Sequence, residues 1–249
     1  MRSYQLEYAS GRRQMYDTNS RERRAERIVK VLQNYFGEKK LKTLKVLDVG
    51  SSTGIVDSYL ANYVGQIVGI DIDKGAIANA KRKYKKKNLN FEIGDAMKLK
   101  YQTGTFDVVI CAQVYEHVPD SKRLFNEINK VLKPGGVCYL SAMNKFTIIE
   151  PHYNLPFLSW LPKPLANKYV LMFGRAQSYY ESPESYWRLK ELTGQFRIED
   201  YTTKIIVDPK KFSYSYKLLN RVPKVLRGCL LAPIAKYMSP SFIWLLVKD

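Results

Sequence analysis

Glycines and carboxylates follow the apolar segments in the first half of the chain. Residues 46–54 read VLDVGSSTG, so an apolar run passes through Asp48 into a loop bounded by Gly50 and Gly54. Glycines at such a turn let the backbone approach a ligand with no Cβ in the way, and ligands of open α/β sheets bind at the carboxyl ends of the strands. The segment therefore predicts a nucleotide-type cofactor loop, although many glycine turns of this kind bind nothing. The loop consists of Gly50, Ser51, Ser52, Thr53 and Gly54.

A second acidic residue, Asp71, closes the apolar segment 66–71 about 20 residues after Gly50. A carboxylate at this position can accept hydrogen bonds from both hydroxyls of a ribose. The spacing also suits a dinucleotide-binding unit, but Ser52 occupies the place of the second glycine in the G-x-G-x-x-G pattern. The loop therefore fits a pyrophosphate poorly.

Alternating apolar and helical segments must position these residues. The expected strands are residues 46–49, 66–71, 90–96, 106–112, 137–142, 196–207 and 242–247. The expected helices begin at Asn19 or Ser20, near Asp73, at Asp120 and at Ser182 or Pro183. Strands that alternate with helices in this way predict a mainly parallel sheet.

The ordered motifs of this region resemble those of the Rossmann-like (class I) S-adenosylmethionine-dependent methyltransferases, in particular the group that includes the ubiquinone-biosynthesis methyltransferases. The motifs are DVGSSTG (48–54), GID (69–71), GDA (94–96), EHV (116–118) and LKPGG (132–136). The resemblance covers residues 40–145. It implies an α/β fold with a seven-stranded, mostly parallel sheet, an antiparallel last strand and helices on both faces.

The resemblance also implies that the chain binds S-adenosylmethionine and releases S-adenosylhomocysteine. Asp48 and the loop from Gly50 to Gly54 would lie beside the methionine part of the cofactor. Gln113 would lie near the sulfonium. Ser52 is a departure, because the family usually has glycine at this position.

The adenosine part of the cofactor is expected at the next two strand ends. The resemblance implies that Asp71 holds the ribose hydroxyls and that Ile72 packs on adenine. Asp95 would accept a hydrogen bond from the adenine amino group, with Ala96 beside it.

A single domain over residues 1–249 is expected, with three additions to the sheet. Residues 1–40 would form an N-terminal cap helix, whose Tyr8 and Tyr16 either close over the site or are surface aromatics of the tail. Residues 144–182 are rich in proline and aromatics and follow the fifth strand, which predicts a lid or pocket wall on the substrate side. Residues 208–240 combine basic and apolar side chains and are expected as a second substrate-side insertion.

The two histidines of the chain, His117 and His152, are the candidate catalytic residues. Methyl transfer from a sulfonium is an in-line displacement, for which the enzyme mainly aligns the reactants and excludes water. A hydroxyl acceptor additionally needs a base. His117 lies close to Gln113 and either acts on the acceptor or anchors its loop, while His152 lies in the aromatic insertion. Tyr115 and Tyr153 are further candidates.

The net charge and the spacing of the cysteines limit the kinds of partner and ligand that are expected. The 41 Lys and Arg against 23 Asp and Glu give a net charge of +18, which favours an anionic partner or reflects only a well-solvated surface. The basic run 81–87 suits the C-terminal end of a helix, with a nucleic-acid patch as the alternative. Cys111, Cys138 and Cys229 have no C-x-x-C spacing, so neither a disulfide framework nor a metal site is predicted.

The sequence has no apolar leader and no apolar run long enough to span a bilayer, so a cytoplasmic protein is expected, with peripheral membrane contact as an open alternative. The preferred hypothesis is a methyltransferase acting on a small-molecule or lipid-linked acceptor, with residues 210–239 on an anionic membrane surface. An RNA methyltransferase is less favoured, because no appended RNA-binding module is recognisable. A noncatalytic binding module is the third reading, against which the acidic residues Asp48, Asp71 and Asp95 argue.

Overall fold

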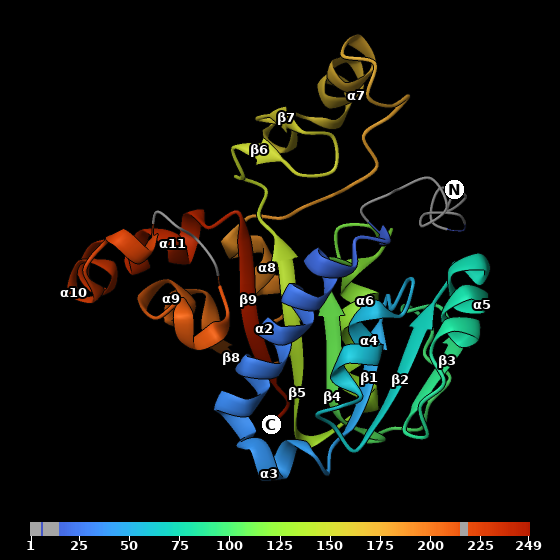
Figure 1. Cartoon of the computed structure of the whole chain (residues 1–249). Coiled ribbons are helices and arrows are strands. Elements are labelled where there is room, and N and C mark those ends of the chain that lie inside the picture. The colour runs from blue at the N-terminus through green and yellow to red at the C-terminus, as the bar shows by residue number, and fades with distance from the viewer. Residues whose placement is uncertain (1–5, 7–14, 215–218) are drawn as a thin grey trace.

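The computed structural model describes residues 6, 15–214 and 219–249, and its centre is a seven-stranded sheet (Figure 1). The strand order is β3-β2-β1-β4-β5-β9-β8. The strands are β1 (Lys45–Val49), β2 (Gln66–Asp71), β3 (Leu89–Ile93), β4 (Phe106–Ala112), β5 (Leu132–Met143), β8 (Arg197–Asp200) and β9 (Ser241–Val247). The predicted Tyr8 lies outside the described residues.

The direction of the strands confirms the expected fold. β1 pairs in parallel with β2 on one side and with β4 on the other, and β3 and β5 continue the parallel pairing outward. The last strand, β9, is antiparallel to both β5 and β8. Because the chain moves outward in opposite directions from β1, the carboxyl ends of β1 and β4 form the switch point at which such sheets bind ligands.

Helices cover both faces of the sheet, as expected. They are α2 (Thr18–Phe36), α3 (Glu38–Leu41), α4 (Ile55–Leu60), α5 (Lys74–Lys83), α6 (Ser121–Val131), α7 (Lys163–Met172), α8 (Tyr186–Leu192), α9 (Tyr201–Val207), α10 (Lys224–Leu226) and α11 (Ala232–Met238). Helices α2, α4 and α9 pack on one face and α6 and α8 on the other.

Alternate side chains of β9 point to opposite faces of the sheet, which explains why an apolar core lies on each face. Trp244 and its neighbours two residues away contribute to the core under α6 and α8, whereas Ile243 and Leu245 contribute to the core under α2 and α9. Successive side chains of a strand point to opposite faces, so an uninterrupted apolar strand must be covered on both. Burying one such side chain stabilises the fold by about 1.5 to 3 kcal/mol.

Five boundaries differ from the sequence prediction by two residues or more or by a capping residue: β3 ends at Ile93 rather than at 96, β5 begins at Leu132 rather than at 137, and in three places a side chain caps a helix elsewhere than expected. α2 begins at Thr18, since Asp17 accepts a hydrogen bond from the Ser20 N–H at 3.2 Å. α8 begins at Tyr186 rather than at Ser182 or Pro183, since Ser185 accepts from the Arg188 N–H. The prediction of one strand over 196–207 is wrong: β8 ends at Asp200, whose carboxylate accepts from the Thr202 N–H at 2.8 Å and begins α9.

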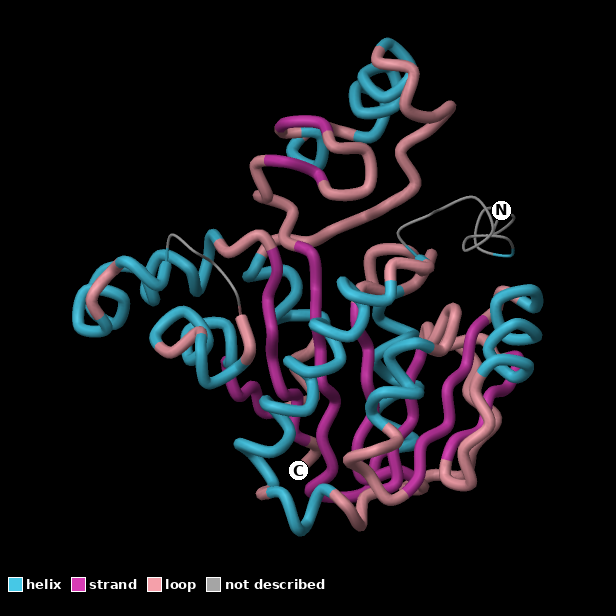
Figure 2. Tube along the Cα trace, viewed as in Figure 1, coloured by secondary structure: helices cyan, strands magenta, loops and turns pink. Residues whose placement is uncertain are grey.

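The segment after β5 stands away from the sheet and has a small core of its own. It contains the short strands β6 (Ile149–Glu150) and β7 (Leu155–Pro156) and helix α7. Figure 2 shows that long loops connect it to the sheet at both ends. Its core consists of Tyr153, Leu155, Leu158, Ala166, Val170 and Tyr179. We call residues 144–182 the aromatic insertion.

Helices α10 and α11 and the π-helical turn Arg227–Leu231 between them lie beside α9 (Figure 1). They leave apolar side chains exposed, with Val225 at 73%, Leu230 at 58% and Ile234 at 60% exposure. Within the residues described, none of the helices is long and apolar enough to cross a bilayer.

Candidate cofactor and acceptor cavity

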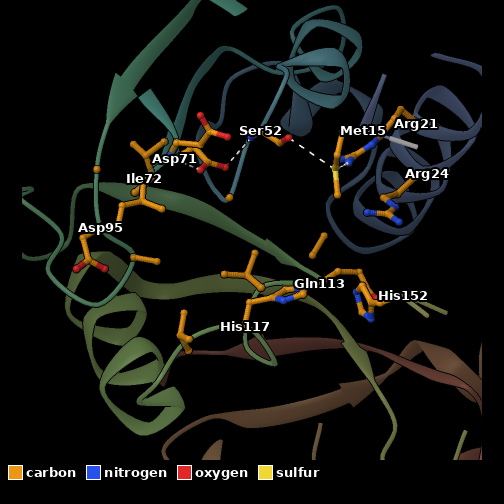
Figure 3. Close-up of a pocket in the computed structure, with 18 of the residues that line it drawn as sticks. Met15, Arg21, Arg24, Ser52, Asp71, Ile72, Asp95, Gln113, His117 and His152 are labelled. Carbon is orange, nitrogen blue, oxygen red and sulfur yellow. Dashed lines mark hydrogen bonds between the residues drawn. The ribbon is translucent and has the colours of Figure 1, made fainter. Parts of the chain in front are cut away.

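A cavity of about 270 Å³ opens at the carboxyl ends of β1, β2 and β4. The start of α2 and the aromatic insertion close it from above. Among the residues predicted for the site, nine line this cavity: Gly50, Ser52, Asp71, Ile72, Asp95, Ala96, Gln113, His117 and His152. Figure 3 shows Asp71, Ile72 and Asp95 at one side and Arg24 and His152 at the other.

The glycine loop after β1 makes room for this cavity. Gly50 has a φ of +88°, and its N–H and that of Ser51 donate to the Ile70 carbonyl at 2.8 and 2.9 Å. A Cβ on Gly50 would lie 2.5 Å from Val114 Cγ2, so any larger residue collides with the loop after β4. Ser52, at the departure from the family pattern, adopts a left-handed φ of +51°.

Asp71 is held by backbone donors at the end of β2. One carboxylate oxygen accepts from the Ser52 N–H at 2.8 Å and the other from the Asp73 N–H at 2.9 Å. Burial raises the pKa of Asp71, while these two hydrogen bonds act in the opposite direction. A carboxylate has about four acceptor sites. Asp71 therefore retains acceptor capacity for a ligand in the cavity.

Asp95 and Ala96 follow β3 at the same end of the cavity. Asp95 accepts from the Met97 N–H at 2.9 Å, which fixes its side chain. The Cα of Gly94 packs so closely on Ile70 that a Cβ would lie 3.2 Å from that side chain. Asp71, Ile72 and Asp95 line the same side of the cavity (Figure 3).

Four predicted residues do not line the cavity. Asp48 is buried. Burial, and to a lesser extent the charge of Asp71, raises its pKa to about 7. Burial and then Asp48 raise the pKa of Asp57 as well. The pair therefore retains a proton near neutral pH. The other three predicted residues that do not line the cavity are Ser51, Thr53 and Gly54.

Those loop residues have structural contacts instead. Thr53 donates its hydroxyl to the Met15 carbonyl at 2.9 Å. Gly54 has a φ of +74°, and a Cβ there would lie 2.6 Å from the Phe91 ring. The loop thus ties the start of α2 to the strands below.

Gln113 lies at the end of β4 in a left-handed conformation, with a φ of +60°. Its side-chain amide donates to the Ser141 carbonyl and to the hydroxyls of Ser141 and Ser241, each at 3.3 Å. A left-handed non-glycine residue is strained and marks a position that the surrounding structure holds in place. These contacts from β5 and β9 hold the Gln113 side chain at the cavity wall.

The rings of His117 and His152 are in contact, with centroids 4.9 Å apart, although the two residues are 35 positions apart in the sequence. His152 Nδ1 lies 2.6 Å from Glu150 Oε1, and the other oxygen of Glu150 accepts from the N–H groups of His152 and Tyr153. Burial lowers the pKa of His152, but the hydrogen bond and charge of Glu150 outweigh it and the net shift is upward. His117 Nδ1 lies 3.7 Å from the buried Glu181.

The two tyrosine candidates lie away from the cavity wall. The Tyr115 hydroxyl donates to the Met143 carbonyl and accepts from the Glu184 N–H, both within the protein interior. Tyr153 packs against Tyr179 in the core of the aromatic insertion. Both residues therefore have packing roles.

Sequence reasoning missed the contribution of the segment that starts α2. Met15, Arg21 and Arg24 line the cavity, and burial lowers the pKa of Arg24. The spacing of Arg21 and Arg24 places both on one side of α2, which is the signal in the sequence. Their position over the cavity depends on how α2 packs across the sheet.

Comparison with known proteins identifies the central part of the chain. Residues 47–140 match the methyltransferase domain family. The ubiquinone biosynthesis O-methyltransferase of Coxiella burnetii is 31% identical over 121 residues, which cover 45% of this chain and 52% of that protein. The Pelagibacter ubique enzyme of the same name is 31% identical over 145 residues, covering 55% and 59%. The chain thus spans about half the length of the curated relatives it matches.

Solved structures share the fold at low identity. An S-adenosylmethionine-dependent methyltransferase from Mesorhizobium loti has a TM-score of 0.57 at 16% identity, covering 88% of this chain and 96% of that one. The [4+2]-cyclase SpnF has a TM-score of 0.53 at 19% identity, covering 90% and 80%. The second similarity shows that this fold also serves a protein named for another reaction, so the fold by itself does not define the chemistry.

Proposed function

We propose that the chain transfers a methyl group from S-adenosylmethionine to a small-molecule or lipid-linked acceptor, on the basis that residues 47–140 match the methyltransferase domain family. The observation that carries the proposal is one cavity with two chemically different ends. Asp71 and Asp95 lie on one side, His152 lies on the other, and His117 and Gln113 lie between them (Figure 3). A cofactor and an acceptor can therefore meet in one cavity.

The residues of the cavity fit the cofactor. Asp71 accepts hydrogen bonds from the ribose hydroxyls with the capacity left by its two backbone bonds, and Asp95 accepts from the adenine amino group beside Ile72 and Ala96. Gly50 lets the loop pass close to Val114 at the cavity wall, because a Cβ there would collide with that side chain. Asp48 acts indirectly in this proposal, by supporting the loop from beneath.

The chemistry needs alignment more than a reactive side chain. The cofactor supplies a methyl group on a sulfonium, which is an already activated carbon. The chain orients the acceptor in line with it, and Met15 and the aromatic insertion exclude water above the cavity. His117 and His152 act on the acceptor, whose proton must leave when it is a hydroxyl.

Calorimetric titration with S-adenosylhomocysteine tests the cofactor part. We expect one site per chain, and transfer of labelled methyl from S-adenosylmethionine into a lipid or small-molecule extract. A folded protein that binds no S-adenosylhomocysteine contradicts the proposal and supports a noncatalytic module. Label that enters RNA instead, with affinity falling steeply as salt rises, supports the RNA alternative.

The exposed apolar surface of α10 and α11 favours an acceptor at a membrane. Val225, Leu230 and Ile234 are exposed there, and Lys224 and Lys236 belong to the same two helices. Apolar side chains flanked by lysines suit the interface of an anionic bilayer. This surface supports the proposal that the protein contacts a membrane and takes a lipid-linked acceptor from it.

Co-sedimentation with vesicles tests this contact. We expect binding to vesicles that contain anionic lipid and little binding to neutral vesicles. The double substitution Val225→Glu with Leu230→Glu lowers the net charge by two, and so does Lys39→Glu on the distant helix α3, which makes it a matched control. Equal loss of binding in both variants would show that only net charge matters and that this surface does not dock.

A further inference from the structure

A compact group of ionisable side chains lies at the acceptor end of the cavity. His117 follows β4, His152 lies in the aromatic insertion, and Glu181 lies where that insertion returns to the sheet. One ligand atom from each of the three lies within 4.8 Å of the others. The segments are far apart in sequence, so only the fold brings these side chains together.

Glu181 has a buried carboxylate with unmet bonding capacity. Its side chain is fully buried, and neither oxygen has a hydrogen-bond partner among the described residues. Lys163, the nearby cation, donates its hydrogen bond to the backbone carbonyl of Glu181 and not to the carboxylate. An unpartnered buried carboxylate is costly, whereas coordination of a cation satisfies it. The carboxylate thus points to a ligand beside the histidines.

Glu116 is a second buried carboxylate of the same kind. It precedes His117, is fully buried, and likewise has two oxygens with no hydrogen-bond partner within the described part of the chain. Burial makes the charged form of both carboxylates costly. A divalent cation would offset this cost.

His152 is oriented as a metal-binding histidine usually is. Its Nδ1 is engaged by Glu150 at 2.6 Å, so Nε2 is the nitrogen left for a ligand. A carboxylate that binds the distal nitrogen fixes the ring and increases the basicity of the coordinating nitrogen. Glu150 is itself held by the N–H groups of His152 and Tyr153 at 2.8 Å each.

The spacing suits a small divalent ion. Bonds of about 2.1 Å in a tetrahedral arrangement separate ligand atoms by about 3.4 Å. His117 Nδ1 and Glu181 Oε1 are already 3.7 Å apart. The third ligand atom lies within 4.8 Å of these two, so binding of an ion requires it to move closer. Two imidazoles and one carboxylate are a donor set that zinc and related transition metals prefer over magnesium or calcium.

We infer that His117, His152 and Glu181 bind one divalent transition-metal ion of the zinc class, with an open coordination position toward the cavity. His117 and His152 both line the cavity, so a fourth ligand can come from there. If the proposed function holds, that ligand is an oxygen of the acceptor, and the ion makes its proton easier to lose. The histidines then act on the acceptor through the ion.

Titration of the metal-free full chain with Co²⁺ and Zn²⁺ tests the site without requiring methyl transfer. We expect one ion per chain by calorimetry, and visible absorption of the tetrahedral kind on adding Co²⁺ that Zn²⁺ abolishes. His117→Ala, His152→Ala and Glu181→Gln are each expected to weaken binding at least 100-fold. Glu150→Gln, a change in a positioning residue, should weaken it by roughly 10- to 100-fold.

Two controls make the result specific. Glu184→Gln changes a carboxyl three residues from Glu181 that is outside the group, and Cys229→Ala removes the exposed thiol, which also binds Co²⁺. Both should bind the ion as the unmodified chain does. A cooperative thermal unfolding transition of each variant shows that it is folded.

The outcomes separate this inference from the proposed function. A chain that binds S-adenosylhomocysteine but takes up no ion at equimolar concentration overturns the metal site and leaves the methyltransferase proposal intact. The metal site is also overturned if the folded His117→Ala and His152→Ala variants bind as tightly as the unmodified chain. A chain that binds the ion but no S-adenosylhomocysteine supports the metal site while refuting the function.

Discussion

Replacing Asp71 by asparagine should separate cofactor binding from stability. The two oxygens of Asp71 accept the N–H groups of Ser52 and Asp73 at 2.8 and 2.9 Å. Asparagine keeps one acceptor oxygen, and its amide group cannot accept at the other position. At least one hydrogen bond between a ribose hydroxyl and a charged acceptor is lost, which costs about 1.5 to 3 kcal/mol. The Kd for S-adenosylhomocysteine should therefore rise by roughly 10- to 150-fold.

The melting temperature of Asp71→Asn should change little. Burial already disfavours the charged form of Asp71, so removing the charge offsets part of the lost backbone hydrogen bonding. Asp208→Asn is the matched control, because Asp208 pairs with Lys224 at 3.0 Å on the surface and lies outside the cavity. If Asp71→Asn bound S-adenosylhomocysteine within threefold of the unmodified chain, the assignment of Asp71 to the ribose would be refuted.

Three further changes test the supports of the cavity. Gly50→Ala should lower the free energy of unfolding by about 1 to 3 kcal/mol in urea titrations, because of its positive φ and the collision with Val114, and Val114→Ala in the same chain should recover part of the loss. Burial raises the pKa of Asp48 from 3.8 to about 7, so the folded chain holds a proton that the unfolded chain releases. Stability should fall as the pH rises from about 4 to 7, and Asp48→Asn should flatten that fall; an unchanged slope would count against the protonated pair. Tyr115→Phe should cost about 1 to 3 kcal/mol, since the Met143 carbonyl and the Glu184 N–H both lose their partner, and an unaltered melting curve would contradict this.

The central strands could be predicted from the sequence because their signals are local. β1, β2 and β4 are apolar runs that end in glycine or polar residues, and the structure places them where those runs lie. The strand predicted over 196–207 failed for an equally local reason. Ile198 and the apolar residues 205–207 favour a strand, but the side chain of Asp200 caps a helix in the middle of the segment.

The sequence predicted the residues on the Asp71 side of the cavity better than it predicted the contacts on the His152 side. Asp71, Asp95 and Gln113 each follow a strand, so the edge of the sheet brings them together. The contact of His117 with His152 depends on how the aromatic insertion folds back, and periodicity carries no information about that. The partnership of Asp48 with Asp57 similarly depends on the path of the loop between β1 and α4.

The aromatic insertion has an apolar core separate from that of the sheet, and only its base meets the cavity. Pro151 and His152 line the cavity, whereas α7 lies at the far end of the segment. Substitutions in α7 can therefore change which molecules gain entry while Glu150 and Glu181 stay anchored. Under the proposed function, substitutions in the outer part of the insertion can accumulate without altering the edge of the sheet at which Asp71 and Asp95 lie.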